Sequence, residues 1–198
     1  RLPREANRLV RQVITEHLVR TLTTMTTHDV RIRRATPDDA AALANFGART
    51  FEETSGPPNR PEDVAMYLAA TYGPDHQARE LADPSRTYYV AEVAGQMAGY
   101  ALVKWAAAPA SVGAPQALEI NRFYVDRAFH GAGVAHVLMA TCIADGAQRG
   151  ATAIWLAVWE RNPRAIRFYE KCGFRDVGTQ RFFVGNDAQT DRVMMREP

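Results

Sequence analysis

The chain has 198 residues, of which 46% are hydrophobic and 23% are charged, and its formal net charge is +2. This length suits one well-buried core and is short for two, and so mild a charge gives no reason to expect a nucleic-acid partner. No apolar run approaches the roughly 20 residues of a membrane-spanning helix, and no signal-peptide core is present. With only two cysteines, Cys142 and Cys172, a disulfide framework is not expected, so we predict a single cytoplasmic domain without a membrane partner.

Residues 1–29 stand apart from the rest of the chain. They carry a basic amphipathic helical pattern that decays into a threonine-rich tract. Such a helix can bind a partner or a membrane surface, but an accessory helix packed on a domain is the commoner case. Met25 is also a plausible natural start, so we treat residues 1–29 as an N-terminal extension or a start-site segment.

The next part of the chain is predicted as a strand followed by two helices. Residues 30–35 alternate like an edge strand, and the Thr-Pro-Asp-Asp that follows is typical of a helix start. This helix should run towards Phe51, before the breaker Ser-Gly-Pro-Pro-Asn. A second helical stretch, residues 61–81, should be broken or kinked at Gly73-Pro74. Loops of this kind between helices often select the substrate.

Three strands follow. Residues 86–93 and 96–105 are predicted as a hairpin with its tight turn at Ala94-Gly95. After a low-complexity loop, residues 119–125 read as a buried strand rich in β-branched and aromatic residues.

A glycine-rich turn, His-Gly-Ala-Gly-Val-Ala at residues 130–135, joins that strand to a long helix that is predicted to begin at Gly133. Its glycines and alanines leave little bulk around the backbone, and the first N–H groups of a helix have no partner within the helix. With the positive end of the helix behind them, such groups bind anions, phosphate above all. An ordinary small-residue turn that packs helix on strand is the alternative interpretation.

The C-terminal part completes the predicted fold. Residues 153–158 form a continuous apolar strand, expected to be parallel to the one before it through a right-handed crossover. A short helix should open at Asn162-Pro163, and residues 175–184 and 192–196 should form a hairpin. This order predicts an α/β fold with a mixed sheet and helices on both faces.

Two segments carry a resemblance to a known family. The turn HGAGVA, together with NPRAIRFYEKCGF at residues 162–174, resembles the signatures of the GCN5-related N-acetyltransferase (GNAT) family. The segments LEINRFYV and RFFVGNDAQTDRVMM are most similar to the PaiA-type spermine/spermidine acetyltransferases. The resemblance implies a GNAT-like acyl-CoA N-acyltransferase domain at residues 30–198, with a central mixed sheet flanked by helices. It also implies acetyl-CoA as cosubstrate and no metal.

The resemblance further implies which residues bind the cosubstrate. The backbone of Phe123, Tyr124 and Val125 would pair with the pantetheine chain. The diphosphate would bind the turn formed by His130, Gly131, Ala132, Gly133, Val134 and Ala135.

The resemblance also implies that Asn162, at the mouth of the last helix, contacts the cosubstrate or positions backbone there. Four basic residues surround this cofactor path: Arg127, Arg164, Arg167 and Lys171. Of these, Lys171 is the candidate to pair with the adenosine 3′-phosphate, although a solvated helix face is the commoner case. The family usually has Gln or Arg where this chain has His130, so one side-chain phosphate contact is not implied.

The chemistry needs one acid and one base. An alkylammonium must lose a proton before it can attack a thioester, and the leaving thiolate must gain one. Tyr169 corresponds to the family's tyrosine near the thioester sulfur and is the predicted acid; a core tyrosine is the alternative. Glu119, eleven residues before His130, is the predicted base, or else a structural strand carboxylate. The N–H of Val125 or a neighbour would polarise the thioester carbonyl.

The predicted activity is acetyl-CoA-dependent N-acetylation of a small cationic amine, such as spermidine or spermine, by direct transfer in a ternary complex. Glu52, Glu53, Asp187 and Asp191 are candidate carboxylates for such an amine, although each is more often a surface charge. Three alternatives stay open: acetylation of a protein N-terminus or lysine, acetylation of an aminoglycoside-type antibiotic, and a CoA-binding regulatory module with little turnover. A homodimer also stays open.

Overall fold

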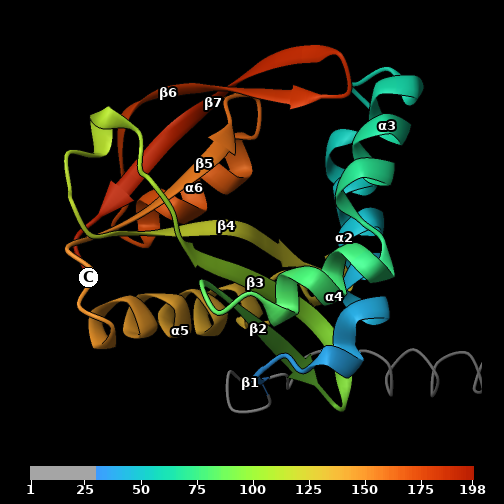
Figure 1. Ribbon diagram of the computed structural model, residues 1–198, viewed down its shortest axis with the longest axis horizontal. Helices are drawn as coiled ribbons and strands as arrows, with labels where there is room; N and C mark the ends of the chain where they lie inside the picture. The colour runs from blue at the N-terminus through green and yellow to red at the C-terminus, as the bar shows by residue number, and fades with distance from the viewer. Residues whose placement is uncertain (1–29) are drawn as a thin grey trace, which may run out of the picture.

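The computed structural model describes residues 30–198, so the helix expected within residues 1–29 lies outside the described residues. The described chain forms one seven-stranded sheet with helices on both faces, as Figure 1 shows. The α/β class with a central mixed sheet is therefore confirmed.

The strands lie in the order β1-β2-β3-β4-β5-β7-β6. Their bounds are β1 (Val30–Arg34), β2 (Arg86–Val93), β3 (Gln96–Trp105), β4 (Ala117–Val125), β5 (Ala153–Trp159), β6 (Arg175–Val184) and β7 (Asp187–Arg196). Only β4 and β5 are parallel, as predicted for the strands that flank the long helix, and every other neighbouring pair is antiparallel.

The helices also follow the sequence pattern. They are α2 (Ala40–Ser55), α3 (Pro61–Thr71), α4 (Pro74–Ala82), α5 (Val134–Gln148) and α6 (Pro163–Lys171), with single 3-10 turns η2 (Pro37–Asp39), η3 (Ala110–Val112) and η4 (Arg127–Phe129). The predicted break at Gly73-Pro74 is confirmed: Gly73 is the extended residue before α4, and Pro74 takes the first helical position.

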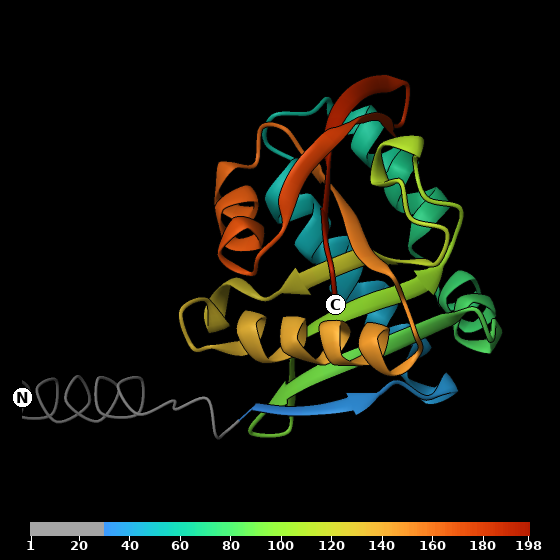
Figure 2. The same cartoon turned by 90° about the vertical axis from the view of Figure 1, so that its left-hand side faces the viewer.

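The sheet buries a different set of side chains on each face. On one face, Leu138 and Cys142 of α5 and Ile166 of α6 pack with the sheet in the largest core cluster. On the other face, Leu43 and Phe46 of α2 pack on the tyrosines and aliphatic residues of β2 and β3. Figure 2 shows α5 in front of the sheet and α2 behind it.

One strand prediction is wrong. The last strand was expected to begin at Arg192, but β7 begins at Asp187 and pairs with β6 along its whole length. The polar run Asp-Ala-Gln-Thr-Asp hid the strand, because part of that stretch faces solvent and part faces a cavity instead of the apolar core. Asp191 therefore lies within a strand, between β5 and β6.

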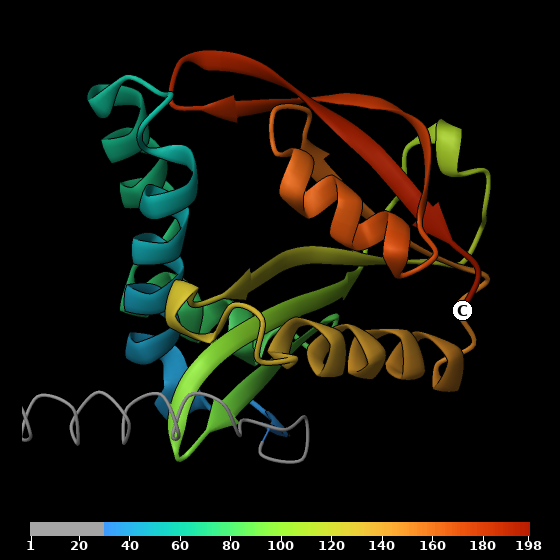
Figure 3. The same cartoon turned by 180° about the vertical axis from the view of Figure 1, so that it is seen from behind.

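The decisive feature of the sheet is the divergence of β4 and β5. They pair over only three positions, from Ala117 with Ala153 to Glu119 with Trp155. Beyond that point the register of β4 against β3 shifts, leaving Asn121 without a partner, and such a bulge bends a strand and increases its twist. The sheet opens from there towards α2, as Figure 3 shows from behind.

Within residues 30–198, no helix combines the length and the apolar character needed to span a membrane.

Candidate active site

A cavity of about 610 Å³ occupies the gap between β4 and β5. The N-terminal ends of α5 and α6 line one end of it. The other end is lined by α2, α3 and the β6–β7 hairpin, which reaches across to α3 in Figure 1. One space therefore connects two helix N-termini to a hairpin on the far side of the sheet opening.

The glycine-rich turn presents unpaired amides at the first of these ends. The N–H groups of Gly131, Gly133, Val134 and Ala135 donate to no acceptor in the described part of the chain. The φ angles of Gly131 and Gly133 are 86° and 82°, in the left-handed region that side chains disfavour, and a Cβ on Gly131 would meet no atom within 4 Å. Free amides, an open approach and a helix N-terminus together suit a diphosphate.

Two amides of the expected cradle are already occupied. The N–H of His130 donates to the Arg127 carbonyl at 3.2 Å, and that of Ala132 donates to the Phe129 carbonyl at 3.2 Å. These bonds close η4 and the turn after it, so His130 and Ala132 shape the cradle without offering it their amides.

The side chain of His130 turns back towards β4. Its Nε2 lies 3.0 Å from the Val125 carbonyl oxygen. Burial, followed by the positive charge of Arg164, lowers the pKa of His130. The imidazole is therefore neutral at working pH, and it cannot replace the charge of an arginine at this position.

The edge of β4 that faces the gap carries backbone groups that do not pair with β3, although the Val125 carbonyl oxygen lies 3.0 Å from Nε2 of His130. The N–H of Asp126 donates to Ala98 of β3 at 2.9 Å. Since backbone groups alternate between the two edges of a strand, those of Phe123 and Val125 point away from β3 and into the gap. An extended amide-bearing chain could pair there as a short strand.

The last helix brings Tyr169 to the cavity. This residue is 8% exposed and packs edge-on against Phe123 and Phe174, with ring centroids 6.2 and 6.1 Å apart. Burial raises the pKa of Tyr169, so the phenol stays protonated at working pH and does not match the acidity of a thiol as its residue type suggested.

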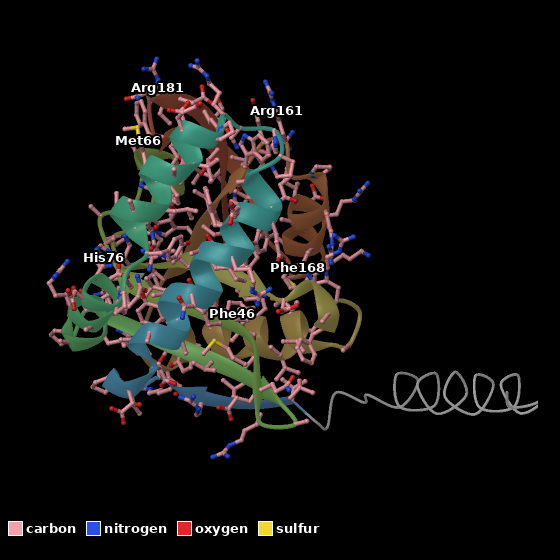
Figure 4. All side chains as sticks on the ribbon, turned by 90° about the vertical axis from the view of Figure 1, so that its right-hand side faces the viewer. Phe46, Met66, His76, Arg161, Phe168 and Arg181 are labelled. Atoms are coloured by element: carbon pink, nitrogen blue, oxygen red, sulfur yellow. The ribbon has the colours of Figure 1, made fainter. Side chains whose placement is uncertain are left out.

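The two ends of α6 differ in what they offer the cavity. Asn162 lines it and caps the helix, since its Oδ1 accepts from the Ala165 N–H at 3.1 Å. Arg164 also lines it, whereas Lys171 is exposed on the last turn and is not among the lining residues. A rise of 1.5 Å per residue places Lys171 about 10 Å along the axis from Arg164, so Arg164 is the basic residue of α6 that lines the cavity. Phe168 of the same helix, labelled in Figure 4, also lines the cavity, and its ring centroid lies 5.8 Å from that of Phe123.

Glu119 lines the cavity, but its carboxylate is engaged. The Asn121 Nδ2 donates to Oε1 at 2.7 Å, and the Lys104 Nζ lies 3.2 Å from Oε2. Both oxygens of the predicted base therefore already have partners.

Of the four candidate carboxylates for a cationic acceptor, three are exposed and one lines the cavity. Glu52, Glu53 and Asp187 are exposed; Glu53 pairs with Arg49 at 3.1 Å, and Asp187 accepts from Gln189 at 2.8 Å. Asp191 alone of the four lines the cavity, and it is 6% exposed. Its Oδ1 is buried without a hydrogen-bond partner in the described chain, and burial raises the pKa of Asp191 to about 6.

Aromatic rings form the wall beside Asp191. The ring of Tyr67 on α3 stacks on Phe51 of α2, with centroids 4.3 Å apart, and meets Phe182 of β6 edge-on at 5.5 Å. All three rings line the cavity. Figure 4 shows Met66 of α3 and Arg181 of β6 at the same end of the molecule, where these elements meet.

Two contacts hold the hairpin against the helices at this end. The Asn186 N–H donates to Oδ1 of the buried Asp63 at 2.8 Å, and the Gln189 amide donates to Asn59 in the loop before α3. The acceptor end of the cavity is thus closed by elements far apart in the sequence.

Sequence reasoning did not predict Tyr67 or His136 as lining residues, because tertiary contacts between distant elements decide their positions. Asp191 did leave a signal. It alternates with Val193 and Met195, so the period of a strand places a carboxylate on the buried side.

Comparison with known protein sequences finds acetyltransferases. The sequence model described as Acetyltransferase (GNAT) family matches residues 49–174. An uncharacterized N-acetyltransferase, Rv2669 of Mycobacterium tuberculosis, is 36% identical over 159 residues, which cover 80% of this chain and 97% of that protein. The N-alpha-acetyltransferase RimI of the same organism is 32% identical over 124 residues, covering 61% of this chain and 73% of RimI.

A solved structure shares the fold. The PaiA N-acetyltransferase from Thermoplasma acidophilum, crystallised in complex with coenzyme A, superposes with a TM-score of 0.71 at 17% identity and covers 85% of this chain and 99% of that one.

Proposed function

Because the chain belongs to the acetyltransferase (GNAT) family and is an N-acetyltransferase that uses acetyl-CoA, we propose that it acetylates a primary amine of a small cationic acceptor. The leading acceptors are the polyamines spermidine and spermine. Their chemistry fits the acceptor end of the cavity, and the sequence is similar to PaiA-type enzymes.

The single observation that carries this proposal is the cavity itself. It joins the free amides at the start of α5 to a buried carboxylate set among aromatic rings. The first end suits an anion, and the second suits a cation, through charge and through the faces of the rings. A thioester bound between them would meet an incoming amine inside the sheet opening.

In this proposal, backbone groups bind the cosubstrate and side chains transfer protons. The amides of Gly131, Gly133, Val134 and Ala135 bind the diphosphate of acetyl-CoA, and the gap-facing edge of β4, at Phe123 and Val125, holds its pantetheine chain.

At the reacting atoms, the Val125 N–H points into the gap, where it can donate to the thioester carbonyl oxygen. Tyr169 is the acid implied by the resemblance: its phenol, which burial makes a weaker acid than a thiol, gives its proton to the departing sulfur as it takes one from the acetylated nitrogen. Glu119 is the base expected from the sequence.

Direct transfer from acetyl-CoA to the amine fits the cysteine positions. Cys142 lies in the main core cluster at 0% exposure, and burial raises the pKa of its thiol. Such a thiol is inert, so a covalent acetyl-cysteine step is not part of the proposal.

The similarity to RimI favours a second acceptor, the α-amino group of a protein N-terminus. A peptide N-terminus also presents one ammonium, with a pKa lower than that of an alkylamine. The aromatic wall would then contact the side chains of the first residues.

Release of the CoA thiol from acetyl-CoA, measured with spermidine, spermine and peptides of free N-terminus, tests the proposal. Turnover on a polyamine supports the leading acceptor, and turnover on peptides alone supports the second. An absence of turnover with every amine would contradict both acceptors.

A further inference from the structure

We propose that the Asp191 carboxylate binds the reacting ammonium of the acceptor and takes its proton. This inference rests on the proposed acetylation of an amine and assigns the base of that reaction to β7 instead of β4. It gives a role to the one carboxylate of the cavity that has a buried oxygen without a hydrogen-bond partner in the described chain.

The position of Asp191 is fixed by the sheet. It lies in β7, where its register partners are Trp159 of β5 on one side and Gln180 of β6 on the other. A residue held between two paired strands has a rigid backbone, so its carboxylate is presented to the cavity in one place.

The carboxylate lacks the partners that buried acids normally have. Asp191 is 6% exposed, its Oδ1 is fully buried, and no side chain or backbone group of residues 30–198 donates to it. A buried carboxylate without a protein partner is costly, so such a group marks a site that a ligand, an ion or a water completes. An ammonium supplies both the charge and the N–H donors.

Glu119 offers the contrast within the same cavity. Lys104 and Asn121 already satisfy its oxygens, at 3.2 and 2.7 Å. To take a proton from the acceptor, Glu119 would have to give up an ion pair, whereas Asp191 would gain one.

The charged and titratable neighbours of Asp191 agree with this role. The acidic Glu160, which follows β5, repels it, and Tyr67 of α3 interacts with it as a neutral phenol. β6 contributes the uncharged Gln180. Burial first, and then Glu160, raise the pKa of Asp191 to about 6, which leaves the group ionised at pH 7 and basic enough to accept a proton.

The aromatic wall supplies the rest of a cation site. Phe51, Tyr67 and Phe182 all line the cavity with Asp191. Aromatic faces attract cations and the methylene groups that carry them, so an alkylammonium is bound by charge at its head and by rings along its stem.

The proton and electron balance of the step is simple. The ammonium transfers one proton to Asp191, and the freed nitrogen lone pair forms a bond to the acetyl carbon while the carbon–sulfur bond breaks. Tyr169 protonates the leaving sulfur and regains a proton from the acetylated nitrogen. Asp191 then releases its proton to water, so the net products are the N-acetyl amine, the CoA thiol and one proton.

Asp191→Asn tests the assignment because it keeps the shape and removes the charge. Exposed Asp187→Asn, in the same strand, is the matched control, and Glu119→Gln tests the competing base. For each variant, thiol release with the best amine of the panel gives kcat/KM between pH 5 and 9, and calorimetry gives the Kd of CoA.

We expect Asp191→Asn to lower kcat/KM about 100-fold or more and to abolish its rise through pH 6, while the Kd of CoA changes less than twofold. Asp187→Asn should retain kcat/KM within about twofold. A loss of less than threefold in Asp191→Asn, or loss of the pH 6 limb only in Glu119→Gln, would overturn the proposal.

A second readout needs no turnover. Carbon NMR of the Asp191 carboxyl in the CoA-bound protein, titrated with spermidine and with a peptide of free N-terminus, should show the carboxyl signal shift and its midpoint move below pH 6 on amine binding. If no amine is acetylated but this shift is seen, the proposed function fails and the ammonium site stands. An unshifted carboxyl signal with both probes would refute the site.

Discussion

The Nζ of Lys104 lies 3.2 Å from Oε2 of Glu119, across the antiparallel pair β3 and β4. This ion pair sits where the sequence placed the catalytic base. We expect Glu119→Gln to retain kcat/KM within about fivefold and to lower the free energy of unfolding by about 1 kcal/mol, because Lys104 loses its charged partner. Thiol-release kinetics and urea unfolding measure the two effects, and a 100-fold loss of kcat/KM would restore Glu119 as the base.

The phenol of Tyr169 is the proposed proton donor to the leaving sulfur. Tyr169→Phe should lower kcat at least tenfold and leave the Kd of CoA within about twofold, since only the hydroxyl is removed from a ring that packs on Phe123 and Phe174. Tyr89→Phe, on β2 away from the cavity, is the control. Equal turnover in wild type and Tyr169→Phe would remove Tyr169 from the chemistry.

Alanine variants of two glycines with similar backbone conformation can distinguish a loss of CoA binding from an effect of backbone strain. Gly131 and Gly150 flank α5, with φ angles of 86° and 75°, and a Cβ at either one meets no atom within 4 Å. Both alanine variants should lose about 1 kcal/mol of stability from the left-handed backbone. Only Gly131→Ala should also raise the Kd of CoA, about tenfold, because its methyl enters the amide cradle. Similar Kd values for the two variants would contradict the cradle.

The buried Asp191 carboxylate is also predicted to destabilise the ligand-free protein at neutral pH. Its pKa is about 6 in the folded state against 3.8 for an ordinary aspartate, so the folded protein binds the proton more tightly. The stability contributed by that proton is present below pH 4 and is lost as the pH rises through 6. Asp191→Asn should therefore be more stable than wild type by up to about 3 kcal/mol above pH 7, with the difference vanishing near pH 4. Urea unfolding across this range checks the sign, and a destabilised variant at pH 8 would contradict it.

The contact between Asp63 and Asn186 closes the acceptor end of the cavity. Asp63→Ala removes the acceptor of the Asn186 N–H and should cost about 1 kcal/mol of stability. By loosening the hairpin against α3, it should raise KM for the amine while sparing the Kd of CoA, for which we propose the other end of the cavity. A change in the Kd of CoA alone would show that the two ends are not separate.

Local patterns in the sequence were enough for most of the fold and for the glycine turn. Strand alternation, the Pro-initiated helices and this turn are set by neighbouring residues, so the elements and the turn at residues 130–135 could be predicted in place. The start of β7 could not, because the polar run from Asp187 to Asp191 has no apolar period that marks a strand.

The acceptor end was decided by tertiary structure. In the sequence, Glu119 lies in a predicted strand and Asp191 directly before one, and no local pattern tells which of the two carboxylates stays unpaired. Packing brings Lys104 to Glu119, while the parting of β4 and β5 leaves Asp191 buried and unpaired beside the rings of α2 and α3. The ion pair of Glu119 comes from Lys104, 15 residues away in the chain, and the burial of Asp191 comes from the packing of distant elements. The sequence pattern by itself indicated an acetyl-CoA-dependent N-acetyltransferase, and only the fold distinguished the unpaired Asp191 from Glu119.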